Sequence, residues 1–304
     1  MKGYLSPQYA ESLREFGLPR LLPRSGGWIL QRNIPGSAEC DAMGCYPLFS
    51  CCDWSRLPED LAELENEVVC LGVVPDPFDD FREDALRKAF PDKLVPLKQH
   101  FVVDLAKPPE SFVTKHHQYY AKKALKDVSI EVAADPVVYL DEWESLYSCL
   151  RARHGLKGIK AFSKNCFALQ LAVPGAIMFR ALQEGTAVGA HIWYVHSNGI
   201  AAASHLAAFS EAGYTLMASY ALYYEAIRYF AERLRWLNIG TGAGAQPDAN
   251  DGLTRFKRGW STETRTAYFC GRILSPSRYR EIAEEKGMAG ADYFPAYRAG
   301  EFDS

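Results

Sequence analysis

The sequence lacks three features that would place it in a specialised class of protein. Its 304 residues contain no uninterrupted apolar run of the ~18 residues that a membrane-spanning helix needs. The formal net charge is only -3, which gives no electrostatic case for binding nucleic acid, because chains that bind it are usually basic. Residues 1–7 lack the apolar stretch of a secretory signal peptide. These absences predict a cytoplasmic protein with no membrane span and no DNA partner.

The cysteines indicate neither a disulfide framework nor a metal site. Eight cysteines in a chain of this length are too few to replace a hydrophobic core. Cys40, Cys45, Cys51 and Cys52 lie close together, but their spacing matches no common zinc pattern. We therefore expect free, mostly buried thiols and no bound metal.

The composition is that of an ordinary globular protein with many aromatic residues. Apolar residues make up 48% of the chain, charged residues 23% and aromatic residues 13%. The length allows two domains of ordinary size. A polar segment at 155–160 is the best linker candidate, and it predicts domains at 1–157 and 158–304.

The first half predicts a loose mixture of strands and helices. We expect strands at 27–33, 67–74, 98–105 and 128–132, and helices at 7–17, 57–64, 80–89, 111–126 and 139–153. Residues 34–56, which carry the four clustered cysteines, are expected to be irregular.

The second half predicts an antiparallel meander followed by a long helix. Strands are expected at 167–173, 177–183, 187–196 and 200–209, joined by Pro-Gly, Glu-Gly and Ser-Asn-Gly turns. The helix at 214–235, a short strand from 236, a strand at 264–274 and a helix at 277–287 complete the chain. This order favours an α+β fold over a doubly wound parallel sheet.

Residues 236–260 combine a glycine-rich turn with a lysine among aromatic residues. Glycines at 240, 242 and 244 allow the backbone to approach a ligand or another segment closely. Lys257 lies between Phe256 and Trp260, in a segment expected to lead into the last strand. A charge among rings is costly to bury unless a polar or anionic group meets it. The stretch is therefore the first candidate site.

Three motifs together resemble the FemAB-like branch of the GNAT-fold acyltransferases. They are the strand and basic helix at 100–126, the strand Ala-Val-Gly-Ala-His-Ile-Trp-Tyr from 187, and the final Leu-Asn-Ile-Gly-Thr-Gly with Gly-Leu-x-x-Phe-Lys-x-Gly-Trp. The resemblance covers most of the chain from about residue 67. It implies two GNAT-like domains, each a mixed, largely antiparallel sheet flanked by helices.

The resemblance also implies a reaction and a catalytic residue. Proteins of this group transfer an acyl or aminoacyl group from a thioester or a tRNA onto an amine, so the implied donor is acyl-CoA or aminoacyl-tRNA. The lysine of the Phe-Lys pair lies near the transferred group in the family, which assigns that role to Lys257 and the flanking place to Phe256. The usual pyrophosphate-binding turn is not matched, because residues 209–218 carry one glycine, Gly213, and an acid, Glu211.

Several further residues have both a functional and a structural interpretation. His205, among small residues, is either a catalytic base with a pKa near neutrality or a core histidine. Tyr214 either binds the donor or packs in the core, and Trp260 and Gly242 are candidate substrate-binding residues. His191 and His196 point to opposite faces of one strand, so they cannot form a metal pair, and they are expected to be structural or solvent-exposed.

The polar loop and the basic helix offer two more candidates. Asp248 and Asp251 either orient an amine or cap a turn. A group of side chains on the basic helix either holds a phosphate-rich donor or forms a solvated face: Lys115, Tyr119, Tyr120, Lys122 and Lys123.

The sequence therefore predicts an N-acyltransferase. Its expected acceptor is an amine of a cell-envelope precursor, a polysaccharide unit or a small metabolite. The alternative is a catalytically silent GNAT-fold binding module, which the missing pyrophosphate turn favours. An open site at Lys257 would favour the enzyme, and a salt-bridged, filled site the silent module.

Overall fold

The computed structural model describes residues 1–65, 67–243 and 251–301. Two compact units are formed, one from residues 1–8 and 98–265, the other from residues 9–97 and the chain from 266 onward. The chain passes between the units three times, within α1 (Pro7–Ser12), β5 (Lys93–Asp104) and β11 (Glu263–Ile273). The units therefore divide the chain differently from the expected domains 1–157 and 158–304, and residue 157 lies inside the first unit.

The first unit contains a mixed, largely antiparallel sheet. Its strands are β6 (Ser129–Ala133), β7 (Ala176–Gln183), β8 (Thr186–Val195), β9 (Ala201–Phe209) and β10 (Trp236–Gly240), together with β5. The order is β5-β10-β9-β8-β7-β6. Only β9 and β10 run parallel among these pairs.

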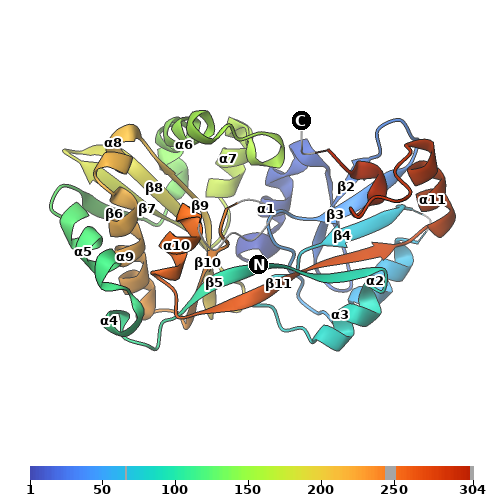
Figure 1. Cartoon of the computed structure of the whole chain (residues 1–304), viewed down its shortest axis with the longest axis horizontal. Helices are drawn as coiled ribbons and strands as arrows, with labels where there is room; N and C mark the ends of the chain where they lie inside the picture. The colour runs from blue at the N-terminus through green and yellow to red at the C-terminus, as the bar shows by residue number, and fades with distance from the viewer. Residues whose placement is uncertain (66, 244–250, 302–304) are drawn as a thin grey trace. The chain divides into compact units, whose positions relative to one another are not determined.

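Helices cover both faces of this sheet. On one face α5 (Lys115–Ala124) packs beside α9 (Ala218–Ala231), as Figure 1 shows. Trp193 of β8 contacts Phe230 of α9 on this face. On the other face lie α6 (Leu140–His154) and α7 (Lys164–Leu171), and Tyr194 donates a hydrogen bond to the carbonyl of Gln170. Neighbouring residues of one strand thus point to opposite faces of the sheet and pack into two separate layers of core.

Shorter helices complete the first unit. They are α4 (Pro109–Phe112), α8 (Glu211–Thr215) and α10 (Gly252–Arg258), with 3₁₀ turns at Gly3–Leu5, Pro136–Tyr139 and Gly158–Lys160.

The second unit has a smaller sheet of order β1-β2-β3-β4-β11. Its strands are β1 (Leu18–Leu21), β2 (Trp28–Asn33), β3 (Cys40–Gly44) and β4 (Cys70–Val73), with the C-terminal part of β11. The helices α2 (Leu57–Glu63), α3 (Glu83–Ala89) and α11 (Pro276–Glu285) flank it, with 3₁₀ turns at Arg14–Phe16 and Ala296–Arg298. The short helix α1 (Pro7–Ser12) precedes β1.

The α+β class predicted from the sequence is confirmed, but four local predictions are wrong. Residues 34–56 are not all irregular, because they include β3. Of the expected strand 167–173, residues 167–171 belong to the helix α7, which Ser163 caps by accepting from the amide of Cys166. The run Phe-Ala-Leu-Gln-Leu-Ala-Val fits both periods, and its buried residues recur at helical spacing here.

The other two errors lie beside the glycine-rich stretch. Lys257 lies on the helix α10, whose N-cap Asp251 accepts from the amides of Leu253 and Thr254. The expected long helix from 214 to 235 is two helices, because Met217 adopts a left-handed φ of 56° between α8 and α9. A non-glycine residue in that region interrupts the helix.

Within the described ranges, no helix has both the length and the apolar character needed to cross a bilayer.

Candidate active site

The candidate site lies where β9 and β10 separate in the first unit. The two strands pair in parallel over only three residues, Ala201–Ala203 with Trp236–Asn238. A bulge between Ser204 and Leu206 shifts the register of β9 against β8. β9 then continues to Phe209, whereas β10 ends at Gly240. The end of β10 therefore approaches side chains from other elements.

Lys257 reaches the end of β10 because residue 240 is glycine. A Cβ at position 240 would lie 2.9 Å from Lys257 Nζ, and the φ of Gly240 is +77°. Both the close approach and the positive φ favour glycine there. The glycine-rich turn thus admits the lysine side chain to the strand end.

Burial lowers the pKa of Lys257 to about 7. The positive charge of Lys98 lowers that pKa further, and the carboxylate of Asp251 acts in the opposite direction. Lys257 forms no ion pair with any residue that the structure describes. A lysine in such a position is charged only part of the time near neutral pH.

Two neutral histidines lie within electrostatic reach of Lys257. Burial, followed by the charge of Lys257, lowers the pKa of His191 to about 3. Burial also lowers the pKa of His100 to about 4, with Lys257 and Lys98 adding to the effect and a bond to Asn238 opposing it. Both rings are therefore uncharged at neutral pH.

Asn238 fixes the tautomer of His100. Its Oδ1 lies 3.0 Å from His100 Nδ1 and also accepts from the amide of Gly240 at 3.0 Å. Because an amide oxygen only accepts, Nδ1 of His100 carries the proton. The other nitrogen, Nε2, is then a lone-pair acceptor.

His191 begins a buried polar chain to α9. Its Nε2 lies 2.8 Å from Ser204 Oγ, and Ser204 also bonds to the hydroxyl of Tyr223. The rings of His191 and Tyr223 lie 4.8 Å apart at 34°. His191 Nδ1 is buried and has no hydrogen-bond partner within the described ranges. An unpartnered buried nitrogen is costly, and a bound polar group would relieve that cost.

The aromatic residues flanking Lys257 form a wall against α9. Phe256 is partly buried and contacts the rings of Tyr220 and Tyr223 at 5.0 and 5.1 Å. Trp260 is fully buried and stacks on Tyr223 at 5.9 Å and 27°. Phe256 thus lies beside the site, and Trp260 supports it from the core.

Gly242 acts on packing, since a Cβ there would lie 1.9 Å from Thr254 Oγ1. Of the two loop acids, Asp251 caps α10, and Asp248, like Gly244, lies outside the described residues. No group of three or more His, Cys, Asp or Glu side chains in the described part of the chain has the arrangement of a metal site.

His205 is not grouped with Lys257. Its ring stacks on Tyr194 at 4.4 Å and 22°, and its Nδ1 lies 3.2 Å from the hydroxyl of Tyr4. Tyr194 points to the face of the sheet opposite Trp193 and α9. Burial lowers the pKa of His205 to about 3. The environment is that of a core histidine.

Tyr214 belongs to a surface cluster on α8. Its ring lies 4.1 Å from the guanidinium carbon of Arg153 and 5.6 Å from the ring of Phe209. Burial raises the pKa of its hydroxyl.

The start of α8 carries no exposed phosphate cradle. Ser210 Oγ accepts from the amide of Gly213 at 3.2 Å, and Glu211 pairs with Arg153 at 3.0 Å. A Cβ on Gly213 would lie 2.0 Å from the carbonyl oxygen of Val188, so this glycine is needed for packing. The start of α8 is therefore capped by its own serine and carries an acid, two features that disfavour an anion there.

The basic helix α5 presents aromatic rings and cations together. Tyr119 is 62% exposed, and ring contacts of 5.2, 5.4 and 5.0 Å run from it through Tyr120 and Tyr220 to Phe256. Lys115, Lys122 and Lys123 are exposed and form no ion pair with a described residue. This surface combines rings with positive charges that no described acid neutralises.

Sequence reasoning did not identify His100, His191, Ser204, Tyr223 and Asn238 as site residues. A polar Asn within the apolar run Trp-Leu-Asn-Ile was the available signal, because a buried amide needs a partner.

Comparisons with known proteins show the fold. No family model matches the sequence, and no curated protein matches it. Solved structures do match: FemX has 14% identity and a TM-score of 0.66, covering 91% of this chain and 93% of that one. The C-terminal domain of a putative lysylphosphatidylglycerol synthetase from Agrobacterium fabrum has 14% identity and a TM-score of 0.65, covering 90% and 91%. L-PGS from Bacillus licheniformis has 14% identity and a TM-score of 0.58, covering 88% and 92%.

The predicted resemblance to the FemAB-like group is thus confirmed at the level of fold. At these identities the likeness concerns the fold alone, and the activity has to be argued from the site.

Proposed function

We propose that the protein is an acyltransferase that moves an acyl or aminoacyl group onto an amine beside Lys257. The observation that carries the proposal is a half-buried lysine that lies against the strand end at Gly240, with its pKa lowered to about 7 and no ion pair to a described residue, among neutral histidines. Strongly perturbed groups of this kind are typical of reactive sites. A purely structural lysine would be paired with an acid or extend into solvent.

The proposed step is attack of a neutral amine on the carbonyl carbon of an activated donor. The new C–N bond forms, the bond to the leaving sulfur or oxygen breaks, and one amine proton passes to the leaving group. Negative charge develops on the carbonyl oxygen in between. Protonated Lys257 stabilises that charge, and the approaching anion favours the protonated form.

The two neutral histidines do not compete with Lys257 for the negative charge that develops on the carbonyl oxygen. Because His100 and His191 are uncharged, they leave Lys257 as the cation facing the oxyanion. His191 Nδ1 and His100 Nε2 offer polar contacts for the acyl group or the acceptor amine. We propose these two histidines as positioning residues.

His205 and Tyr214, which the sequence predicts to be catalytic and substrate-binding, are secondary candidates for those roles. His205 contacts Tyr4 and Tyr194, and Tyr214 contacts Arg153. Because these contacts lie apart from Lys257, the proposed step uses neither side chain.

We propose an aminoacyl-tRNA donor in preference to an acyl-CoA. The start of α8 is capped by its own Ser210, which argues against the usual pyrophosphate position. The α5 surface offers Tyr119 with Lys115, Lys122 and Lys123, a combination that suits an unpaired nucleic-acid end. Two of the similar structures carry lysylphosphatidylglycerol synthetase or L-PGS names, which is compatible with aminoacyl transfer.

The proposed acceptor is an amine of a cell-envelope precursor, a polysaccharide unit or a small metabolite in the cytoplasm. The alternative function is a catalytically silent binding module, which the missing pyrophosphate turn still supports. Such a module is expected to neutralise Lys257 with an acid, and the described residues form no such pair. The enzyme is therefore the better-supported interpretation.

The test is a ligand screen followed by an assay of transfer. We expect aminoacyl-tRNA, and not acetyl-CoA or longer acyl-CoAs, to raise the melting temperature, because a ligand that binds only the native state stabilises it. A stabilising acyl-CoA would overturn the choice of donor. If no donor shifts the melting temperature or supports turnover, the silent module is correct.

A further inference from the structure

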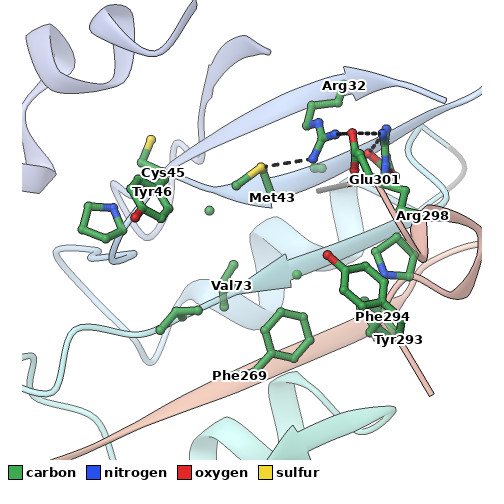
Figure 2. Close-up of a pocket in the computed structure, with 17 residues that line it drawn as sticks. Arg32, Met43, Cys45, Tyr46, Val73, Phe269, Tyr293, Phe294, Arg298 and Glu301 are labelled. Carbon is green, nitrogen blue, oxygen red and sulfur yellow. Dashed lines mark hydrogen bonds and ion pairs between the residues drawn. The ribbon is translucent and has the colours of Figure 1, made fainter. Parts of the chain in front are cut away.

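A pocket of about 130 Å³ lies in the second unit, between its strands and the segment after α11 (Figure 2). Gly72 of β4 and Gly271 of β11 are register partners and have no side chains on this face. The ring of Phe294 fills the place beside Gly271, 2.9 Å from where a Cβ would be. The pocket remains between this ring and β3.

Its walls are mostly apolar and aromatic. Phe269 and Phe294 lie 5.9 Å apart at 63°, and Met43, Tyr46 and Tyr293 are among the other lining residues drawn in Figure 2. A cavity of this kind with a volume of about 150 Å³ admits one benzene ring. The pocket therefore has room for a single six-membered ring.

Two arginines at one end of the pocket differ in how many of their N–H groups have a good hydrogen-bond acceptor. Arg298 is buried and donates to both carboxylate oxygens of Asp41, at 2.6 and 2.9 Å. It also donates to Glu301 at 2.9 Å and to the carbonyl of Asn33 at 2.9 Å. Four of the five N–H donors of its guanidinium are thus engaged in holding the C-terminal segment.

Arg32 is engaged less completely. It pairs with Glu301, and its Nη1 meets the sulfur of Met43 at 3.4 Å (Figure 2). A thioether is a weak acceptor, so this part of the guanidinium can accept a better partner. The Arg32 side chain is 15% exposed, which leaves it accessible from solvent.

Glu301 can release Arg32 without becoming an unpaired acid, because Arg298 holds the same carboxylate. An incoming carboxylate could then form a bidentate pair with the planar guanidinium of Arg32.

We propose that this pocket binds a planar aromatic carboxylate of about the size of benzoate. Its ring lies between Met43 and the rings of Phe269 and Phe294, and its carboxylate pairs with Arg32. The proposal stands independently of the acyl-transfer activity, because every residue that it uses belongs to the second unit.

The test is calorimetric titration of the full-length protein with sodium benzoate. We expect one saturable site per chain, with binding weakened at least tenfold, or about 1.4 kcal/mol, in Arg32→Gln. Benzamide, which has the same shape without the charge, should bind at least tenfold more weakly than benzoate.

Glu301→Gln is the matched variant that should gain affinity, because it removes the carboxylate that competes for Arg32. A gain cannot result from misfolding, so this variant keeps the test decisive if Arg32→Gln is unstable. Absence of saturable benzoate binding, equal binding by Arg32→Gln when folded, or no gain in Glu301→Gln would overturn the proposal.

Discussion

A lysine keeps a pKa near neutrality only where water and acids are both kept away from its ammonium group. Lys257 approaches this condition, because it is half-buried, Gly240 lets it lie against the end of β10, and Asp251 is engaged as the cap of α10. The ordinary pKa of a lysine is ~10.4, so the site makes protonation costly until an anion arrives. Lys257 is thus partly uncharged in the free protein and becomes protonated when an anion lies beside it.

The pH dependence of transfer follows from this pKa. The lowered pKa, about 7, means that free enzyme loses the proton of Lys257 as the pH rises through 7. Since the charged form is the active one, kcat/KM of the wild type should fall above pH 7 relative to that of Lys257→Arg, which stays charged. The acceptor amine ionises equally for both proteins, so the ratio of the two profiles isolates Lys257.

A ratio that is constant between pH 6 and 9 would contradict the electrostatic role of the lysine. A ratio that rises above pH 7, with an inactive arginine variant, would indicate a proton-accepting lysine instead.

Some residues of the candidate site can be predicted from a local motif, and others cannot. Lys257 and Phe256 could be predicted because a local motif carries them. His100 and His191 could not, because they meet Lys257 only through the order of β5, β10, β9 and β8 in the sheet. Strand order and register are long-range properties that no local pattern specifies. His205 has the same residue type as His191 and faces the opposite layer.

At the scale of elements, α5 is the surface on which the donor proposal depends. Its exposed lysines form no ion pair with a described acid, and Tyr119 is exposed beside them. A nucleic acid bound there would release counterions, so its affinity should depend strongly on salt.

Charge reversal on α5 tests this dependence. Lys122→Glu and Lys123→Glu should each weaken tRNA binding and reduce the slope of log affinity against log salt concentration by about 1. Lys88→Glu, on the exposed surface of α3 in the second unit, is the control and should leave the slope unchanged. Filter binding of tRNA at several salt concentrations measures this slope. An equal effect of all three variants would show that α5 does not bind the donor.

Two elements were misassigned for identifiable physical reasons. The apolar run 167–173 is expected to be a strand, but Ser163 caps a helix over 164–171 and the buried residues follow helical spacing. The Phe-Lys segment is expected to lead into the final strand, yet Asp251 caps a helix of seven residues there. Caps are weaker signals than apolar patterns, and tertiary packing decides between them.

At the scale of the whole molecule, the α+β class followed from the order of elements, whereas the compact units did not follow the halves of the chain. β5 and β11 each contribute to both units, so the boundaries of the units do not coincide with a single division of the sequence. The assignment of 1–157 and 158–304 as two GNAT-like domains stays a prediction. The likeness to FemX extends over 91% of the chain, so the fold as a whole is the shared feature.

The most direct test compares transfer by the wild type and by Lys257→Met. With an aminoacyl-tRNA donor and a panel of amines, the variant should lose about 10²–10³ in kcat/KM, as expected when a charge facing an oxyanion is removed. Its melting temperature at pH 6 should be no lower than that of the wild type, because below pH 7 the native state carries the cost of a buried ammonium. Full turnover by a folded Lys257→Met protein would contradict the assignment of the active site.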